Sequence, residues 1–222
     1  MPDTPFWLQL SFALITALAI FGFYRSTKSK TVLIGTLALT ALSGVLALVE
    51  FYDVPNAMPP RLPVVILPAV IGMLWFFFSD KGRAILDSMD MKVMTYTHTV
   101  RVPVELVILG LFMYGAMPES MTFEGRNFDV LSGLTAPLMG YLGYQRKTLS
   151  KGALIAWNIV CLALVTQVVV TGIFAAPSVL QQIDFDQPNV AVLYFPYVWL
   201  PAVVVPIVML GHLAAIRALL KK

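Results

Sequence analysis

Long apolar runs, each close to the length that crosses a lipid bilayer, recur along the whole sequence and constrain the fold more than any other feature. A helix needs roughly 20 apolar residues to span the hydrocarbon core. Seven such segments can be drawn, over residues 5–24, 31–52, 62–78, 98–117, 129–145, 152–175 and 190–217. Because no soluble domain is left between them, the sequence predicts one transmembrane domain over residues 1–222, an all-α integral membrane protein built as a seven-transmembrane-helix bundle.

The composition agrees with this class. Of the 222 residues, 59% are apolar and 12% are charged, and the mean hydropathy is +0.82. A soluble domain has roughly 25% charged residues. We therefore expect the lipid bilayer to be the main partner. The net charge of +3 belongs to the loops, so it gives no indication of nucleic-acid binding. The oligomeric state is left open.

Basic and acidic loops alternate along the chain. The basic ones are "RSTKSK", "SDKGRAILDSMDMK", "QRKTLSK" and the closing "RALLKK", whereas Arg61 and Arg126 are the basic residues among the acid-rich connections. The positive-inside rule then predicts an outside N-terminus and a cytoplasmic C-terminus. The first apolar run has no basic residue before it and no cleavage site after it, so we expect it to remain in the protein.

Residues 80–95 are too charged to cross a membrane. Ile85, Leu86, Met89 and Val93 nevertheless fall close to helical spacing, which favours an interfacial helix over these residues. An ordinary loop is the alternative.

Two stretches, "LPVVILPAV" from Leu62 and "LPAVVVPIV" from Leu200, place prolines five residues apart. They are compatible with a 3+1+3 repeat, in which two three-helix units are joined by the fourth span. Proline removes a backbone donor, so the third and seventh spans should bend.

A group of ionisable residues lies inside the fourth expected span, "THTVRVPVELVILGLF". Spacings of three, four and seven residues put His98, Arg101 and Glu105 on one helical face. A charge near the bilayer centre costs roughly 3 kcal/mol, so we expect this face to point inward and Arg101 to pair with Glu105. We expect Glu105 to lie about 10 Å from the cytoplasmic end of the fourth span. His212, near the cytoplasmic end of the seventh span, is expected in the same inner half of the membrane.

This cluster gives the leading functional hypothesis, the movement of a small solute or protons through a cavity lined by the four residues. Glu105 would exchange a proton or bind a cation, Arg101 would hold its charge state, and the bent spans would act as hinges. Three alternatives remain: an ion pair that only fixes the helices, a membrane-embedded redox or lipid-modifying enzyme, and a non-catalytic subunit or scaffold. We expect no cofactor, although His98 and His212 supply the minimum for a haem iron.

Further polar residues lie outside this cluster. Glu124, Arg126 and Asp129 crowd a short loop and suggest an outer mouth, although nearby aromatic residues are also typical of a membrane-interface belt. Asn158 in the sixth span is most simply explained by a hydrogen bond between helices.

Several chemistries are excluded by what the sequence lacks. Cys161 is the single cysteine, so no disulfide framework and no thiolate metal cage can form. The last span has no lysine before Lys221, which excludes a retinal Schiff base within the membrane. There is no H-E-x-x-H, G-x-S-x-G, C-x-x-C or phosphate-binding glycine loop. We therefore expect no metal site, and a non-enzymatic role more than an enzymatic one.

At "HTVRVPVELV", "FEGRNFDVLSGLTAP" and "FPYVWLPAVVVPIVMLGHLAAIRALL" the chain resembles uncharacterised multi-pass inner-membrane proteins of bacteria. The resemblance covers the fourth, fifth and seventh expected spans, about half of the chain. It implies the inner (plasma) membrane of a bacterial cell and no particular activity.

Overall fold

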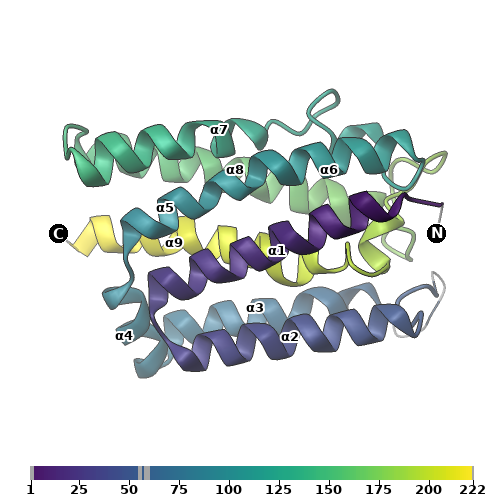
Figure 1. Cartoon of the computed structure of the whole chain (residues 1–222), viewed down its shortest axis with the longest axis horizontal. Helices are drawn as coiled ribbons and strands as arrows, with labels where there is room; N and C mark the ends of the chain where they lie inside the picture. The colour runs from purple at the N-terminus through teal and green to yellow at the C-terminus, as the bar shows by residue number, and fades with distance from the viewer. Residues whose placement is uncertain (1–2, 55–56, 58–60, 222) are drawn as a thin grey trace.

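The computed structural model describes residues 3–54, 57 and 61–221, and all regular elements in this part of the chain are helices (Figure 1). The α-helices are α1 (Phe6–Thr27), α2 (Lys30–Leu48), α3 (Leu62–Phe78), α4 (Asp80–Ser88), α5 (Met91–Thr97), α6 (Arg101–Met113), α7 (Val130–Met139), α8 (Lys151–Ala175) and α9 (Val205–Lys221). Short 3₁₀ turns occupy His98–Val100, Glu119–Met121 and Ala191–Leu193, and π-helices occupy Gly140–Gln145 and Leu200–Val204.

Four described helices are long and apolar enough to cross a membrane: α1, α2, α8 and the continuous segment Leu200–Lys221. A fifth is added if α3 and α4, which are bent by 83°, count as one broken span. The structure therefore has the features of a helical membrane protein, but with four or five candidate spans in its described part, where hydropathy gave seven.

The difference arises where the helices are interrupted. The segment expected at 98–117 holds only the 13 residues of α6, because it begins with the 3₁₀ turn His98–Val100, which separates α6 from α5. The segment expected at 129–145 holds α7, with 10 residues, and then a π-helix that follows Pro137. A proline and a π-turn both disturb the regular i→i−4 hydrogen bonds.

The long helices lie roughly along one axis, in three layers (Figure 1). The layer of α2 and α3 lies on one side, α7 and α8 lie on the other, and α1, α9 and the rod formed by α5 and α6 lie between them. The start of α1 and the end of α9 are at opposite ends of the bundle (Figure 1). The middle layer is therefore packed between the two outer layers, while α1 keeps one face exposed.

Apolar side chains cover the outside of the bundle as well as its interior. Leu14 and Leu18 of α1 are each 58% exposed, and Leu134 of α7 is also 58% exposed. A soluble protein rarely exposes a continuous apolar surface of this kind. The outer surface is thus suited to contact with lipid chains.

The segment expected as an interfacial helix forms two helices. α4 is capped by Ser79, whose Oγ accepts from Gly82 N at 2.9 Å, and it buries Leu86 while Lys81 stays exposed. The chain turns at Met89, and Asp90 then caps α5 by accepting from Val93 N at 3.1 Å. Because α5 continues into the rod of α6, the rod starts at Met91, seven residues before the start at residue 98 that the sequence suggested.

Two glycines allow the close helix contacts on which the interior depends. A Cβ atom on Gly133 of α7 would lie 3.0 Å from both Arg101 Cβ and Val102 N. A Cβ atom on Gly211 of α9 would lie 2.5 Å from Met94 Cε and 2.9 Å from His98 Cε1. Only glycine permits these distances, so α7 and α9 both approach the rod directly beside its ionisable residues.

Candidate functional site: a buried polar network

The four ionisable residues predicted from the sequence all lie in the interior. His98 is 1% exposed, Arg101 3%, Glu105 2% and His212 0%. Because the rod begins at Met91, Arg101 lies about 15 Å and Glu105 about 21 Å from that end of the rod. The cluster is therefore deeper than the sequence suggested, near the middle of the bundle.

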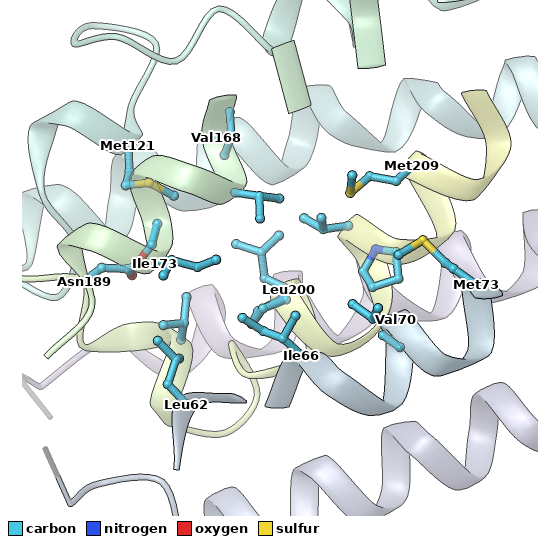
Figure 2. Close-up of a pocket in the computed structure, with 17 residues that line it drawn as sticks. Leu62, Ile66, Val70, Met73, Met121, Val168, Ile173, Asn189, Leu200 and Met209 are labelled. Atoms are coloured by element: carbon cyan, nitrogen blue, oxygen red, sulfur yellow. The ribbon is translucent and has the colours of Figure 1, made fainter. Parts of the chain in front are cut away.

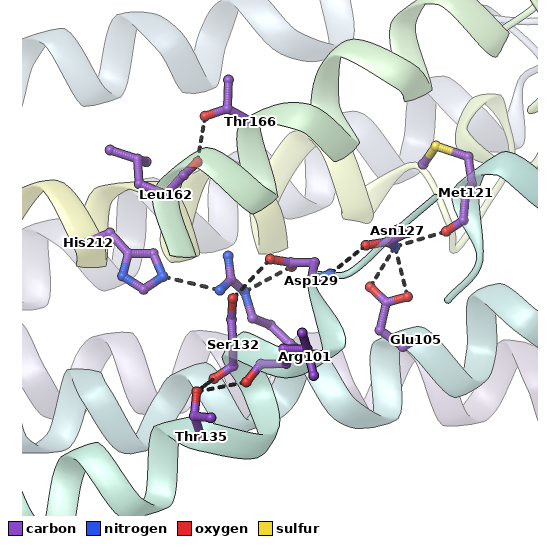
Figure 3. Close-up of polar contacts among 11 residues, drawn as sticks. Arg101, Glu105, Met121, Asn127, Asp129, Ser132, Thr135, Leu162, Thr166 and His212 are labelled. Atoms are coloured by element: carbon purple, nitrogen blue, oxygen red, sulfur yellow. Dashed lines mark hydrogen bonds and ion pairs between the residues drawn. The ribbon is translucent and has the colours of Figure 1, made fainter. Parts of the chain in front are cut away.

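Arg101 was expected to pair with Glu105, but it contacts Asp129 and His212 instead. Its Nε lies 3.1 Å from Asp129 Oδ2, and its Nη1 lies 3.2 Å from His212 Nε2 (Figure 3). Asp129 reaches the guanidinium because the start of α7 passes over the rod next to Gly133. Ser132 Oγ donates to Asp129 Oδ1 at 3.3 Å. The buried ion pair of Arg101 therefore joins α6 to the start of α7 and does not link two residues of α6.

Glu105 is instead held by Asn127. Asn127 Nδ2 lies 2.8 Å from both carboxyl oxygens of Glu105 and 2.9 Å from Met121 O (Figure 3). The other side of the same amide, Oδ1, accepts from the backbone N–H of Asp129 at 2.9 Å. These contacts form a continuous polar connection from Glu105 through Asn127 and Asp129 to Arg101, which we call the buried polar network together with His98, His212 and Asn158.

The two histidines stack on each other. Their ring centroids are 3.9 Å apart with an angle of 6° between the planes, and the Trp157 ring contacts both edge-on. Asn158 Nδ2 donates to Leu154 O at 2.8 Å, which leaves Asn158 Oδ1 to accept, 2.9 Å from His212 Nδ1.

These partners determine the tautomer of His212. Arginine only donates hydrogen bonds, so His212 Nε2 must accept from Arg101, whereas Nδ1 must carry the hydrogen that Asn158 Oδ1 accepts. The arrangement is that of a neutral imidazole. His212 therefore adds no charge to the network in this state.

Some buried polar atoms have no partner among the residues that the structure describes. They include His98 Nδ1 and Arg101 Nη2 in the network, and Tyr144 Oη and Asn189 Oδ1 outside it. Buried polar atoms are nearly always hydrogen-bonded, in many cases to enclosed water. The two network atoms, His98 Nδ1 and Arg101 Nη2, mark the positions where water would extend the network.

The three residues expected at an outer mouth are separated. Glu124 and Arg126 are exposed, whereas Asp129 is 5% exposed and belongs to the network. The side chain of Asp129 points inward, where its carboxylate compensates the charge of the buried Arg101 guanidinium. Asn127 was missed, since it lies in an irregular loop, where no helical periodicity points to it.

Two apolar cavities lie elsewhere in the bundle. One, of about 170 Å³, lies between α3 and α8 and is lined by residues such as Ile66, Val168 and Leu200 (Figure 2). The other, of about 480 Å³, lies between α2, α3 and the segment Leu200–Lys221. Neither cavity is lined by His98, Arg101, Glu105 or His212, so the predicted cavity around these residues is not one of the two.

The network is poorly arranged for a metal or a haem. The described residues contain no group of three His, Cys, Asp or Glu side chains that could hold a metal ion. Two axial histidines point their ring nitrogens at a haem iron from opposite sides. Here the rings of His98 and His212 are stacked, and both nitrogens of His212 already have partners.

Fold and site together define a class: a helical membrane protein whose interior holds a network of charged and polar side chains. A family model described as Domain of unknown function (DUF8737) matches residues 59–220, which is most of the chain and includes every residue of the network. The protein belongs to this family. No curated protein and no solved structure matches the chain.

Proposed function

We propose that this protein moves protons across a membrane, alone or together with a small solute, and that the buried polar network carries the exchangeable proton. In this proposal the chain crosses the inner (plasma) membrane of a bacterial cell seven times, with the N-terminus outside and the C-terminus in the cytoplasm. The short helices α6 and α7 then cross as parts of longer, interrupted rods.

The charges of the network carry the proposal. Asp129 and Glu105 are two acids, Arg101 carries one permanent positive charge, and the contacts of His212 are those of a neutral ring. With His98 also neutral, full ionisation would leave one uncompensated negative charge in the middle of the bundle. Uncompensated charge in such surroundings is costly, so the network is more stable when it binds one proton.

The contacts favour Glu105 as the residue that holds this proton. Asp129 lies 3.1 Å from the guanidinium, which stabilises its ionised form. Glu105 has only the amide of Asn127 as its close partner, at 2.8 Å. Exchange at Glu105 would change the charge of the network by one without breaking the ion pair of Arg101.

The route from Glu105 has two parts. Asn127 connects Glu105 to the loop before α7, which also carries the exposed residues Glu124 and Arg126. In the other direction Arg101, His212 and Asn158 connect the network to α8 and α9. The atoms without partners are the places where enclosed water would complete the path.

The last span contains a break in its helix that can act as a hinge and so open the network to one side of the membrane at a time. The π-helix Leu200–Val204 contains Pro201 and is followed by Pro206, and His212 lies on the same rod. Hinges commonly occur where the helical hydrogen-bond pattern is interrupted. A small bend there would displace His212 relative to Arg101 and so open or close the connection.

The test is proton flux into vesicles that contain the purified protein. With an imposed pH gradient and an internal pH-sensitive dye, we expect flux above that of empty vesicles for the unmodified chain. Glu105→Gln should reduce the flux to the level of empty vesicles while the protein still folds. The matched control is Glu119→Gln, since Glu119 is exposed and lies outside the network. Unchanged flux in Glu105→Gln would refute the role of Glu105.

A purely structural role is the second candidate. Neither apolar cavity reaches the network, and the contacts of the network join α6, α7, α8 and α9. In that case the protein would be a scaffold or a membrane subunit. Vesicles with the unmodified chain would then show no flux above empty ones, whereas Asp129→Asn would still destabilise the fold. A partner that co-purifies at fixed stoichiometry would support this second candidate.

A further inference from the structure

The apolar cavity between α3 and α8 has one polar side chain at its end (Figure 2). Its walls come from α3, with Ile66 and Val70, and from α8, with Val169. Its floor comes from the π-helix Leu200–Val204 and the residues that follow it. The polar side chain is Asn189, which is 1% exposed.

The hydrogen bonds of Asn189 fix the orientation of its amide. Its backbone N–H donates to Ala175 O at 2.9 Å, and its Nδ2 donates to Gly172 O at 3.3 Å. Both acceptors are carbonyls in the last turn of α8, and Gly172 O also accepts from the backbone N–H of Ala176 at 3.1 Å. Since Nδ2 must face a carbonyl, Oδ1 is the atom left over, and it accepts no hydrogen bond from the described residues.

We propose that this cavity binds a neutral, membrane-dissolved molecule with an apolar body and one hydroxyl group that donates to Asn189 Oδ1. This proposal does not depend on proton movement through the buried polar network. A buried acceptor without a donor is destabilising in general, and a hydroxyl donor would remove that cost.

The walls determine the rest of the chemistry. Apart from Asn189, the lining residues are apolar, and no charged residue is among them, so a charged ligand would lose its hydration without compensation. The volume of about 170 Å³ is close to that of engineered apolar cavities of about 150 Å³ that bind benzene. The apolar body is therefore about the size of one six-membered ring.

The ligand would enter from the lipid. On α8, Val169 lines the cavity, while its neighbour Val170 is 45% exposed on the outer surface. On α3, Leu67 is 52% exposed next to Ile66, which lines the cavity. The cavity thus lies between two helices whose outer faces suit lipid chains, so a molecule dissolved in the membrane reaches it sideways.

The test is photolabelling in vesicles with two aryl-diazirine probes, one bearing a benzylic alcohol and one bearing a methyl group in its place. We expect the alcohol to label peptides of α3 and α8 about 5-fold more than the methyl probe, as one hydrogen bond worth about 1 kcal/mol gives. Asn189→Leu should reduce labelling by the alcohol to that of the methyl probe and leave the methyl probe unchanged.

A neighbouring pair of variants tests the place of binding. Val169→Phe fills the cavity and should abolish labelling by both probes there, whereas Val170→Phe points outward and should leave both unchanged. If Asn189→Leu does not fold, competition on the unmodified chain decides, since unlabelled benzyl alcohol should compete about 5-fold better than toluene. Equal labelling or competition by the two compounds, or equal effects of the two phenylalanine variants, would overturn the proposal.

Discussion

The buried ion pair between Arg101 and Asp129 gives the sharpest prediction about stability. The two side chains are 3% and 7% exposed and their charged atoms are 3.1 Å apart. At an effective dielectric constant of about 20, two unit charges at that distance attract by roughly 5 kcal/mol. Breaking a buried pair by removing one partner costs roughly 3–5 kcal/mol in measured cases, which agrees. Asp129→Asn keeps the shape and should therefore lower the free energy of unfolding by about 3–5 kcal/mol.

The assay is equilibrium unfolding in mild detergent, followed by circular dichroism while a denaturing detergent is titrated. Arg101→Met should cost a similar amount, because it leaves Asp129 buried without a counter-charge. The double variant with Arg101→Met and Asp129→Leu should recover most of the loss, since replacing both partners by apolar residues is often neutral. A loss below about 1 kcal/mol for Asp129→Asn, the size expected of an exposed pair, would refute the pairing described here.

Three further predictions concern other contacts. Gly211→Ala should lower the free energy of unfolding by about 1–3 kcal/mol, because the added methyl group overpacks against His98. Tryptophan fluorescence should also change, because Trp157 contacts both imidazoles, and an unchanged spectrum and stability would contradict the close contact. Asn127→Leu removes the partner of a buried carboxyl and should cost about 1.5–3 kcal/mol in the same unfolding assay. The hydrogen bond from Lys221 in the last turn of α9 lowers the pKa of Asp87. The contact between the two side chains is therefore present above the ordinary pKa near 3.8 and is lost as the pH falls through the lowered value. Amide exchange near the end of α9 should rise only in that acid range.

The shared face of the rod was predictable from the sequence. Helical spacing alone places His98, Arg101 and Glu105 together, and the cost of charge in lipid turns that face inward. Spacing also favoured the wrong partner for Arg101. A pair four residues apart is the local solution, whereas Asp129 competes from another helix and is admitted because Gly133 has no side chain.

The number of continuous spans was less predictable, for a similar reason. Hydropathy averages over about 20 residues and does not register a 3₁₀ turn at His98–Val100 or a π-helix after Pro137. Such interruptions depend on neighbouring helices, whose groups form hydrogen bonds with the backbone N–H and C=O groups that the break leaves unpaired. Asn127 in the loop before α7 was missed for the same reason, because its role depends on where the loop folds and has no periodic signal.

The central claim is that the buried polar network holds one exchangeable proton on Glu105. Infrared difference spectroscopy of the protein in lipid, recorded across a pH titration, measures this directly, because a protonated carboxylic acid has a carbonyl band separate from those of carboxylates. The account predicts such a band in the unmodified chain, its loss as the pH rises, and its absence from Glu105→Gln, while Glu119→Gln keeps it. A network without that band near neutral pH, or a band that survives Glu105→Gln, would contradict the account.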